Sequence, residues 1–329
     1  MRVLTADDVR KALPMDVAID AMRGAFAALS SGSARVPTRC HLPIDAHDGV
    51  TLVMPALVQE EGAEALAVKV VSLFARNADR GLARIQAAVI VLDPQTGRPV
   101  ALLEGATLTA IRTGAASGVA TDLLARPDSR TVAIFGAGVQ GRTQLEAVCT
   151  VRPVEIAWVY DPEAPRLEAL IRELAGSGGI DADVRAADSP QRAVREADVI
   201  CTATTAARPV FADADLKPGA HVNAIGSYQP HVREVPAETV CRATIVVDSR
   251  EAALAEAGDL IQPIRDGLLR PEDIRAELGE LILGRPGGRR SADEITLFKS
   301  VGVAVQDAAA ARVALERAAQ QRLGREVPW

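Results

Sequence analysis

Residues 131–161 read TVAIFGAGVQGRTQLEAVCTVRPVEIAWVYD, and this segment predicts a nucleotide-binding strand–helix–strand unit. An apolar run leads into Gly136, Gly138 and Gly141, and a second apolar run ends at Asp161. In such a unit the first glycine permits a tight turn, the second lets backbone N–H groups approach a pyrophosphate, and the third allows close helix–strand packing. An acid roughly 20 residues further on hydrogen-bonds the ribose. The segment therefore predicts dinucleotide binding; the alternative is a turn of the same shape with no ligand.

The bulk composition is that of an ordinary globular chain and excludes several functions. With 329 residues, 48% hydrophobic and 24% charged, the chain is long enough for two domains that each have a core. Its net charge of −6 and the lack of any Lys/Arg block argue against a nucleic-acid partner. No apolar run approaches the roughly 20 residues that a membrane helix needs, and the first residues resemble a capped helix rather than a signal peptide. We therefore expect a cytoplasmic protein with no membrane partner.

The spacing of cysteines and histidines gives no sign of a metal site. The four cysteines and four histidines are scattered, without the short spacings of metal sites or disulfide frameworks. Two of the cysteines lie in apolar strand-like runs, which favours buried thiols in a reducing compartment. We expect no catalytic metal.

The first hundred residues predict an α+β module. From Thr5 to Gly32 the pattern predicts two helices. The first begins with a cap at Thr5, the second has Pro14 in its first turn, and Gly32 caps its C-terminus. Strand-like runs follow, the last two joined as a hairpin by the turn at 93–97, and then comes a helix rich in small residues. The expected strands are 50–54, 66–73, 85–92 and 99–103, and the expected helix is 106–124.

Strands and helices alternate between residues 131 and 248, which predicts a parallel, doubly wound Rossmann sheet. Beyond it we expect helices at 250–260 and 271–278, a loop at 284–290, and one long helix over 294–322. The expected strands of the sheet are 132–135, 156–160, 182–185, 199–203, 221–225 and 245–248, with helices at 165–174 and 190–196.

Three basic residues upstream of the glycine turn are candidates to hold a substrate. Lys69 is the one lysine in the apolar run LAVKVVSLF, and by alternation it points away from its neighbours; a solvent-facing lysine is the alternative. Arg112 is the lone charge in TAIRTGAAS, and its planar fork suits carboxylate or phosphate recognition; a structural ion pair is the alternative. Arg39 carries a weaker signal, because many loop arginines are simply solvated.

Five segments of the chain resemble the ornithine cyclodeaminase/mu-crystallin family and occur in the family's order. They are TAIRTGAASGVA (109–120), GAGVQG (136–141), AIGSYQPHVREV (224–235), SREAALAEAGDL (249–260) and DEITLFKSVGVAVQD (293–307). The resemblance implies a Rossmann domain inserted into an α+β domain for substrate binding and dimerisation. We place the NAD(P)-binding domain at 116–302, and the substrate-binding and dimerisation domain at 1–115 and 303–329.

The resemblance also assigns functional residues, position by position. Arg39, Lys69 and Arg112 would hold the substrate carboxylate, with Lys69 also near the reacting carbon, so that Lys69 and Arg112 are candidate catalytic residues. The residues that would contact the cofactor are Thr113 at the domain junction, Gly136, Gly138, Val139 and Gln140 at the pyrophosphate, Asp161 at the ribose, Thr202, Ala203 and Thr204 after the fourth strand, and Ser300, Val301 and Gly302 on the nicotinamide side.

Two positions depart from the ornithine cyclodeaminase pattern. Tyr228 takes the place of an Asp that handles the distal amino group of ornithine, and Lys299 stands before Ser300 where cyclodeaminases tend to have an Asp. Both positions are more like the ketimine reductase branch of the family. Tyr228 is then a neutral hydrogen-bond donor with a catalytic role, since a reference pKa of about 10 argues against a base, or else a packing residue.

The resemblance therefore implies an NAD(P)H-dependent reductase of cyclic α-imino acids that yields proline or pipecolate. It also implies a homodimer, with a small amino or imino acid as the substrate. NAD(H) is favoured because Asp161 would repel a 2′-phosphate, although Arg166 could compensate and keeps NADP(H) possible. Three alternatives stay open: an ornithine cyclodeaminase with recycled NAD⁺, an alanine dehydrogenase-type enzyme, and a non-catalytic binding protein like mu-crystallin.

Overall fold

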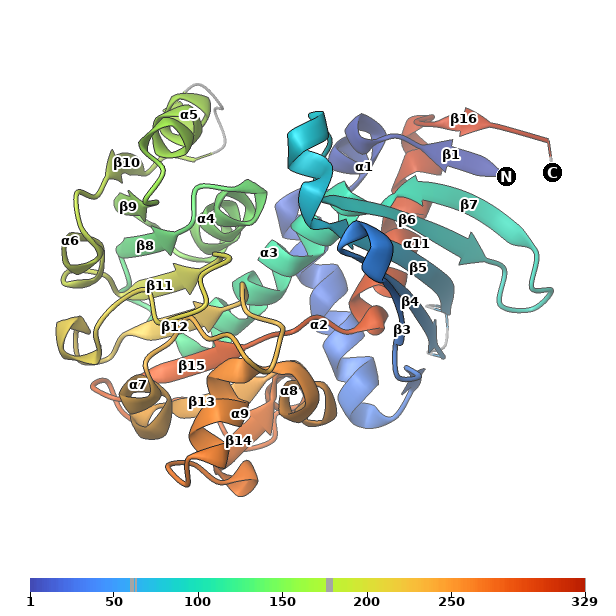
Figure 1. Cartoon of the computed structure of the whole chain (residues 1–329). Coiled ribbons are helices and arrows are strands. Elements are labelled where there is room, and N and C mark those ends of the chain that lie inside the picture. The colour runs from blue at the N-terminus through green and yellow to red at the C-terminus, as the bar shows by residue number, and fades with distance from the viewer. Residues whose placement is uncertain (60–61, 63, 176–179, 329) are drawn as a thin grey trace. The chain divides into compact units, whose positions relative to one another are not determined.

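The computed structural model describes residues 1–59, 62, 64–175 and 180–328, and the chain divides into two compact units (Figure 1). Unit 1 consists of Met1–Arg112 and Val303–Trp329, and unit 2 is Thr113–Gly302. Unit 2 is thus an insertion in the sequence of unit 1. Helix α3 (Gly105–Leu124) begins in unit 1 and ends in unit 2.

Unit 1 is built on a mixed sheet in which the neighbouring strands β4, β5, β6 and β7 are antiparallel. The first strand pairs parallel to β7 and antiparallel to the last strand, so both chain ends meet at one edge (Figure 1). Its elements are β1 (Arg2–Leu4), α1 (Ala6–Ala12), α2 (Met15–Ser31), β2 (Ala34–Arg35), β3 (Cys40–Ile44), η1 (Asp45–His47), β4 (Gly49–Val58), β5 (Ala65–Phe74), η2 (Ala75–Arg80), β6 (Ile85–Leu92), β7 (Pro99–Glu104), α11 (Ala304–Gln321) and β16 (Arg325–Glu326).

The ends of the first two helices follow from local sequence. Thr5 caps α1 through a capping box with Asp8, in which each side chain accepts a hydrogen bond from the other residue's backbone N–H. Pro14 is the N-cap of α2 rather than a residue of its first turn, and Gly32 ends the helix in the left-handed conformation at φ 84°. The predicted start at Thr5 and stop at Gly32 are therefore confirmed, whereas Pro14 lies one position before the helix that it was expected to begin.

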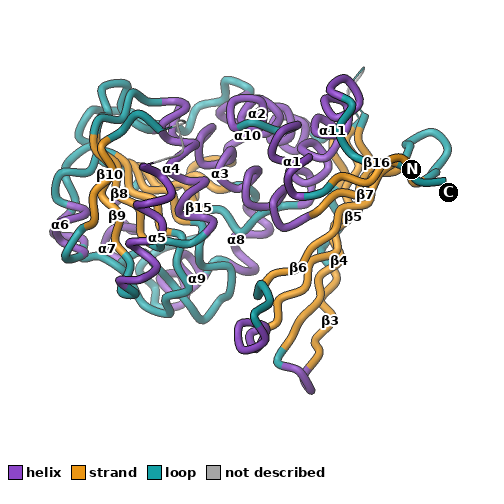
Figure 2. Tube along the Cα trace, turned by 90° about the horizontal axis from the view of Figure 1, so that it is seen from above, coloured by secondary structure: helices purple, strands orange, loops and turns teal. Residues whose placement is uncertain are grey.

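The two faces of the unit 1 sheet differ in what covers them. Along β5, residues 65, 67, 69 and 71 are buried, and helix α11 packs against β4, β5 and β6. The alternate residues of β5 are only half-buried. Figure 2 shows β3, β4, β5 and β6 running side by side. Lys69 therefore lies on the face that α11 covers, and the alternative of a solvent-facing lysine is wrong.

Unit 2 contains the predicted parallel sheet, and the expected fold class is confirmed: a Rossmann sheet inserted into an α+β module. Every strand pair that the structure describes in this sheet is parallel. The elements are β8 (Thr131–Phe135), α4 (Val139–Val151), β9 (Ile156–Tyr160), α5 (Ala164–Ala175), β10 (Asp183–Ala186), α6 (Pro190–Val194), β11 (Val199–Thr202), η3 (Asp213–Asp215), β12 (His221–Ala224), α7 (Ala237–Arg242), β13 (Thr244–Val247), α8 (Arg250–Glu256), α9 (Gly258–Arg265), η4 (Pro271–Asp273), β14 (Ile274–Glu277), α10 (Leu278–Ile282) and β15 (Thr296–Lys299).

The strand order places the glycine turn at the centre of the sheet. The order is β10-β9-β8-β11-β12-β15-β13-β14, so the chain moves outward in one direction from β8 to β10 and in the other from β11. Ligands of open α/β sheets bind at the carboxyl ends of the strands where the order reverses. In this sheet that point lies between β8 and β11, directly beside the glycine turn that follows β8.

Two expectations beyond residue 248 are wrong. Residues 274–277, expected as helix, form β14, in which buried Ile274 and Ala276 alternate with more exposed neighbours. The long helix expected over 294–322 begins only at Ala304, because residues 296–299 form β15 between β12 and β13. All four residues of β15 are buried, so the strand has no polar–apolar alternation to reveal it.

The helix expected over 250–260 is two helices, α8 and α9, which meet at Ala257. A Cβ atom at Gly258 would lie 2.0 Å from the carbonyl oxygen of Val232. The chain therefore turns at a position where only glycine permits close packing on a preceding loop.

We expect Gly141→Ala to destabilise unit 2, because its Cβ would lie 1.9 Å from the carbonyl oxygen of Gly136. The loss in free energy of unfolding should be at least about 1–3 kcal/mol, the usual cost of overpacking, and urea unfolding followed by circular dichroism measures it. Gly138→Ala is the control, since a Cβ at Gly138 meets no atom within 4 Å and its φ is −96°. Equal stability of the two variants would contradict this packing role.

Candidate active site

The glycine turn after β8 has the shape that pyrophosphate binding requires. Gly136 has a φ of 100°, and a Cβ there would lie 2.5 Å from the carbonyl oxygen of Ala203. Gly138 is the N-cap of α4 and borders open space. Val139 begins the helix with its apolar side chain 70% exposed. An open glycine at the N-terminus of a 13-residue helix leaves room for an anion beside free N–H groups.

Asp161, the predicted ribose ligand, also shapes the glycine turn. Its Oδ2 accepts a hydrogen bond from the backbone N–H of Ala137 at 2.8 Å, and its Oδ1 accepts one from the N–H of Glu163 at 2.9 Å. Each oxygen keeps a second lone pair that a ribose hydroxyl could use. Arg166 lies nearby, paired with Glu163 at 3.1 Å on the exposed surface.

Gln140 and Thr113 are placed by local bonds near this turn. The Gln140 carbonyl accepts a hydrogen bond from Thr143 Oγ1 at 3.1 Å in the first turn of α4. The Thr113 carbonyl accepts one from Gln144 Nε2 at 3.4 Å. A Cβ at Gly114 would lie 2.5 Å from the Thr143 carbonyl, so α3 and α4 pack with their backbones in contact at this point of unit 2.

Two buried carboxylates, which the sequence did not single out as site residues, organise the other predicted cofactor loops. Glu234 accepts hydrogen bonds from Thr202 Oγ1 and from both the N–H and the hydroxyl of Thr204. Asp248 Oδ2 accepts bonds from Ser300 Oγ at 2.7 Å, Val301 N at 2.9 Å and Gly302 N at 2.7 Å. Both acids lie within short motifs (REV and VVDS), which is a signal too weak to separate them from surface acids.

Tyr228 lies in the loop after β12 and is 40% exposed. Burial of part of the ring raises the pKa of its phenol above the ordinary value. The side chain is therefore protonated at neutral pH, a state in which it can donate a hydrogen bond but not act as a base.

In unit 1 the structure brings Lys69 and Arg112 together around one carboxylate, that of Asp307. Lys69 Nζ lies 2.7 Å from Asp307 Oδ2, and Arg112 Nε donates to Asp307 Oδ1 at 3.1 Å. Arg112 Nη1 donates to Gln306 Oε1 at 3.0 Å. The side chains of these three charged residues, here named the Asp307 cluster, are at most 7% exposed. The ion pair that was the alternative for Arg112 is therefore present.

The Asp307 cluster carries more positive than negative charge. Burial lowers the pKa of Lys69 to about 8, the Asp307 charge opposes this shift, and the guanidinium groups of Arg112 and Arg39 add to it. Burial raises the pKa of Asp307, but the charges of Arg112 and Lys69 outweigh it, so the net shift is downward. Three cations thus act near one carboxylate, an excess that a substrate carboxylate would balance.

Gln306 and Asp307 are functional candidates that the sequence reasoning missed. Asp307 is the first acid after a run of apolar residues at the start of α11, and both residues are at most 1% exposed. The signal that could have found Asp307 is the one that found Arg112: a lone charge in a stretch of otherwise uncharged, mostly small residues, here 300–311. The contact between Arg112 and Asp307 could not be predicted from sequence alone, because 195 positions separate them.

Other classes of site find little support in the part of the chain that the structure describes. No group of three or more His, Cys, Asp or Glu side chains there could hold a metal ion. All four cysteines are free thiols. None of the helices described is long and apolar enough to cross a membrane.

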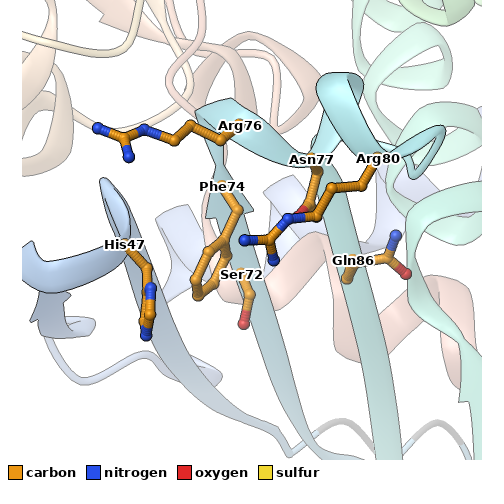
Figure 3. Close-up of a pocket in the computed structure, with 7 residues that line it drawn as sticks. All are labelled: His47, Ser72, Phe74, Arg76, Asn77, Arg80 and Gln86. Carbon is orange, nitrogen blue, oxygen red and sulfur yellow. The ribbon is translucent and has the colours of Figure 1, made fainter.

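A separate recess of about 300 Å³ lies at one end of the unit 1 sheet (Figure 3). Ser72 and Phe74 contribute to it, and by alternation they lie on the other face of β5 from Lys69. Its Arg76 pairs with Asp48 at 2.6 Å. The recess is therefore distinct from the Asp307 cluster. Its lining residues are His47, Ser72, Phe74, Arg76, Asn77, Arg80 and Gln86.

The chain is similar over its whole length to known proteins. A model of the ornithine cyclodeaminase/mu-crystallin family matches residues 1–322. A Delta(1)-pyrroline-2-carboxylate reductase of Bacillus cereus is 40% identical over 330 residues, covering 100% of both chains. The structure of the Thermococcus litoralis Delta(1)-pyrroline-2-carboxylate reductase in complex with NADH and L-proline has a TM-score of 0.94 and 42% identity, covering 99% of this chain and 100% of that one. An archaeal alanine dehydrogenase dimer with bound NAD has a TM-score of 0.91 and 32% identity, covering 100% and 99%.

We expect Asp307→Asn to lower the free energy of unfolding by roughly 3–5 kcal/mol, because it leaves two buried cations without their shared carboxylate. Glu316→Gln is the control on the same helix. Glu316 pairs with Arg312 at the surface, so its loss should cost less than about 1 kcal/mol. Urea unfolding at neutral pH measures both variants. A similar loss for the two would show that the cluster does not stabilise unit 1.

Proposed function

Because the chain belongs to the ornithine cyclodeaminase/mu-crystallin family, we propose that it is an NAD(H)-dependent reductase of cyclic α-imino acids. The reaction would convert pyrroline-2-carboxylate to proline or piperideine-2-carboxylate to pipecolate. The observation that carries the proposal is the full-length likeness to reductases of this substrate class, at 40% and 42% identity. The Asp307 cluster by itself would suit any α-amino or α-imino acid.

In this proposal unit 2 binds the cofactor. The turn at Gly136, Gly138, Val139 and Gln140 would hold the pyrophosphate, since it combines open space with the N-terminus of α4. The remaining proposed cofactor residues are Thr113, Asp161, Thr202, Ala203, Thr204, Ser300, Val301 and Gly302. NAD(H) is favoured because the Asp161 carboxylate would repel a 2′-phosphate and because Arg166 is already paired with Glu163.

Unit 1 would hold the substrate. Arg112 and Arg39 attract its carboxylate, and Lys69 in its ammonium form adds charge and orients the imine. When bound, the cofactor supplies a hydride to the imine carbon, and the imine nitrogen gains a proton. Asp307 keeps Lys69 and Arg112 side by side, so that both cations can approach one carboxylate.

The loop after β12 supports reduction over cyclodeamination. An ornithine cyclodeaminase needs a carboxylate there for the distal amino group, and this chain has Tyr228. Lys299, at the other departure from that pattern, is fully buried and pairs with Asp259 at 2.8 Å. We propose Tyr228 as a neutral hydrogen-bond donor to the substrate.

A spectrophotometric panel tests the function. NADH and NADPH would each be mixed with pyrroline-2-carboxylate, piperideine-2-carboxylate, or pyruvate plus ammonium, with ornithine plus NAD⁺ in a parallel reaction. We expect rapid NADH oxidation with a cyclic imine. A need for free ammonium would indicate an alanine dehydrogenase, and ammonia release from ornithine without net NADH change would indicate a cyclodeaminase. Cofactor binding with no turnover in any reaction would indicate a binding protein.

We also propose a homodimer in the cytoplasm. Pro55, Val68, Ile90 and Leu102 are cross-strand neighbours on the face of the unit 1 sheet opposite Lys69, and this apolar row is only half-buried. Apolar rows of this kind are typical of subunit interfaces. The archaeal alanine dehydrogenase of similar fold is a dimer. The free thiols suit a reducing compartment.

The activity should depend on pH through Lys69. Its pKa of about 8 means that the ammonium form predominates below pH 8 and is lost above it, so kcat/KM should fall as pH rises through about 8. Lys69→Ala should lower kcat/KM roughly 100-fold, equivalent to about 3 kcal/mol, while NADH binding changes little. If the residual activity of this variant keeps the same decline with pH, titration of the substrate rather than of Lys69 is the cause.

Ile90→Lys should convert the dimer into a monomer, because it introduces a charge into the apolar row. Ile85→Lys is the control, since Ile85 is on the same strand and is already 44% exposed. Size-exclusion chromatography with light scattering measures the mass. A monomeric unmodified protein, or an Ile90→Lys variant that stays dimeric, would contradict this interface.

A further inference from the structure

Glu234 gathers more hydrogen-bond donors than its place in a loop would suggest. Its side chain is fully buried, and it accepts five bonds: from Thr202 Oγ1 at 3.1 Å, Thr204 N and Oγ1 at 2.7 Å each, Gly226 N at 2.8 Å and Ser227 N at 3.0 Å. The donors belong to two different segments, the ends of β11 and β12 with the loops that follow them. One carboxylate thus fixes the backbone of both loops.

These two loops lie at the carboxyl edge of the sheet beside the glycine turn. Ala203 precedes Thr204, and a Cβ atom at Gly136 would lie 2.5 Å from the Ala203 carbonyl oxygen and 3.3 Å from Thr204 Cγ2. The loop after β11 therefore packs directly on the turn. Tyr228 follows Ser227 in the loop after β12. Glu234 thereby sets the positions of groups in two neighbouring loops on the β11 side of the strand reversal.

The sequence around Glu234 is adapted to admit its carboxylate. A Cβ atom at Gly226 would lie 2.5 Å from Glu234 Oε1 and 2.5 Å from the Thr204 carbonyl oxygen. Any larger residue at 226 would therefore displace either the carboxylate or the loop after β11. Glycine at position 226 is therefore required for the Glu234 carboxylate to reach this loop.

A second ionic group holds Glu234 itself. Asp259 Oδ1 accepts hydrogen bonds from the backbone N–H groups of Glu234 at 2.7 Å and Val235 at 3.0 Å. Asp259 Oδ2 pairs with Lys299 at 2.8 Å, and Lys299 donates to the Ser227 carbonyl at 2.5 Å. Lys299 thus offsets part of the negative charge of two buried acids and ties the end of β15 to the same loop.

We propose that Glu234 is a positioning residue for the nicotinamide end of the cofactor, acting through the loops that carry Thr204 and Tyr228. A buried carboxylate is costly to desolvate, and an apolar side chain could fill the same space. Four of its five donors come from the loops after β11 and β12 at the ligand-binding edge, and the fifth is the hydroxyl of Thr202, the last residue of β11. The inference rests on the proposed function, in which this edge binds NAD(H).

Glu234→Gln tests the proposal, with Glu238→Gln as the matched control. In the unmodified protein both carboxylate oxygens of Glu234 accept hydrogen bonds. In the variant one oxygen is replaced by an NH2 group, which would face donors that need an acceptor, so the loops must shift. Glu238 is exposed in the first turn of α7, four residues away. The measurements are the NADH dissociation constant by fluorescence titration, kcat, and the primary isotope effect with NADH deuterated at the transferred position.

We expect Glu234→Gln to weaken NADH binding or lower kcat at least tenfold and to raise the isotope effect, while Glu238→Gln stays within twofold of the unmodified protein. A folded Glu234→Gln protein with unchanged NADH affinity, kcat and isotope effect would overturn the proposal, even if its thermal midpoint fell. Such a result would make Glu234 a purely structural residue.

Glu234→Asp keeps the test decisive if Glu234→Gln fails to fold. This change keeps the carboxylate but shortens the side chain by one methylene, so its oxygens cannot reach the donors of both loops at once. A severalfold loss of NADH affinity or a raised isotope effect supports the proposal, and unchanged values overturn it. The titration needs no imine, so an unmodified protein that binds NADH but reduces no cyclic imine refutes the proposed substrate and leaves the test of Glu234 standing.

Discussion

A buried carboxylate must be paired with positive charge or with N–H and O–H donors, and this constraint fixes the loops and side chains of the proposed cofactor and substrate sites. Asp307 is met by Lys69 and Arg112, and Asp248 by the three residues of the loop 300–302. Glu234 is met by five donors from two loops. In each case the acid restrains the groups around it. Backbone loops that would otherwise be free to move are held in one arrangement.

The two units of the chain contribute different halves of the proposed chemistry. Unit 2 offers an open glycine turn at the N-terminus of α4, which suits a dinucleotide. Unit 1 offers a buried site with an excess of positive charge, which suits a carboxylate. The insertion of one unit into the sequence of the other has a physical consequence: β15 and α11 are consecutive, so Ser300 to Gly302 and Asp307 lie within eight residues of one another in sequence although they belong to different units.

Much of the fold could be predicted from local patterns. The strands at 85–92 and 156–160 have the predicted limits, since turn residues or a terminal acid bound each apolar run. The glycine spacing gave the βαβ unit, and Thr5 and Gly32 gave the helix ends. The errors fall at β14 and β15, which are four-residue strands. β15 is buried on both faces and so shows no alternation, whereas β14 alternates over only four residues, too few to separate a strand from a helix segment. Only pairing with neighbouring strands identifies the two.

The sequence by itself determined that a glycine turn with an acid some 20 residues later follows a strand, from which we predict dinucleotide binding, and that Lys69 and Arg112 are isolated charges in their segments. The family motifs then ordered these features along the chain. Only the tertiary structure decided that Lys69 and Arg112 share Asp307, and that Glu234 joins the loops after β11 and β12. The physical reason is that a charge in an apolar run indicates that its burial must be compensated, but the run does not show which residue compensates it. That partner lies up to 238 residues away in sequence, between Lys69 and Asp307, and it becomes known only when the strands and helices are packed together.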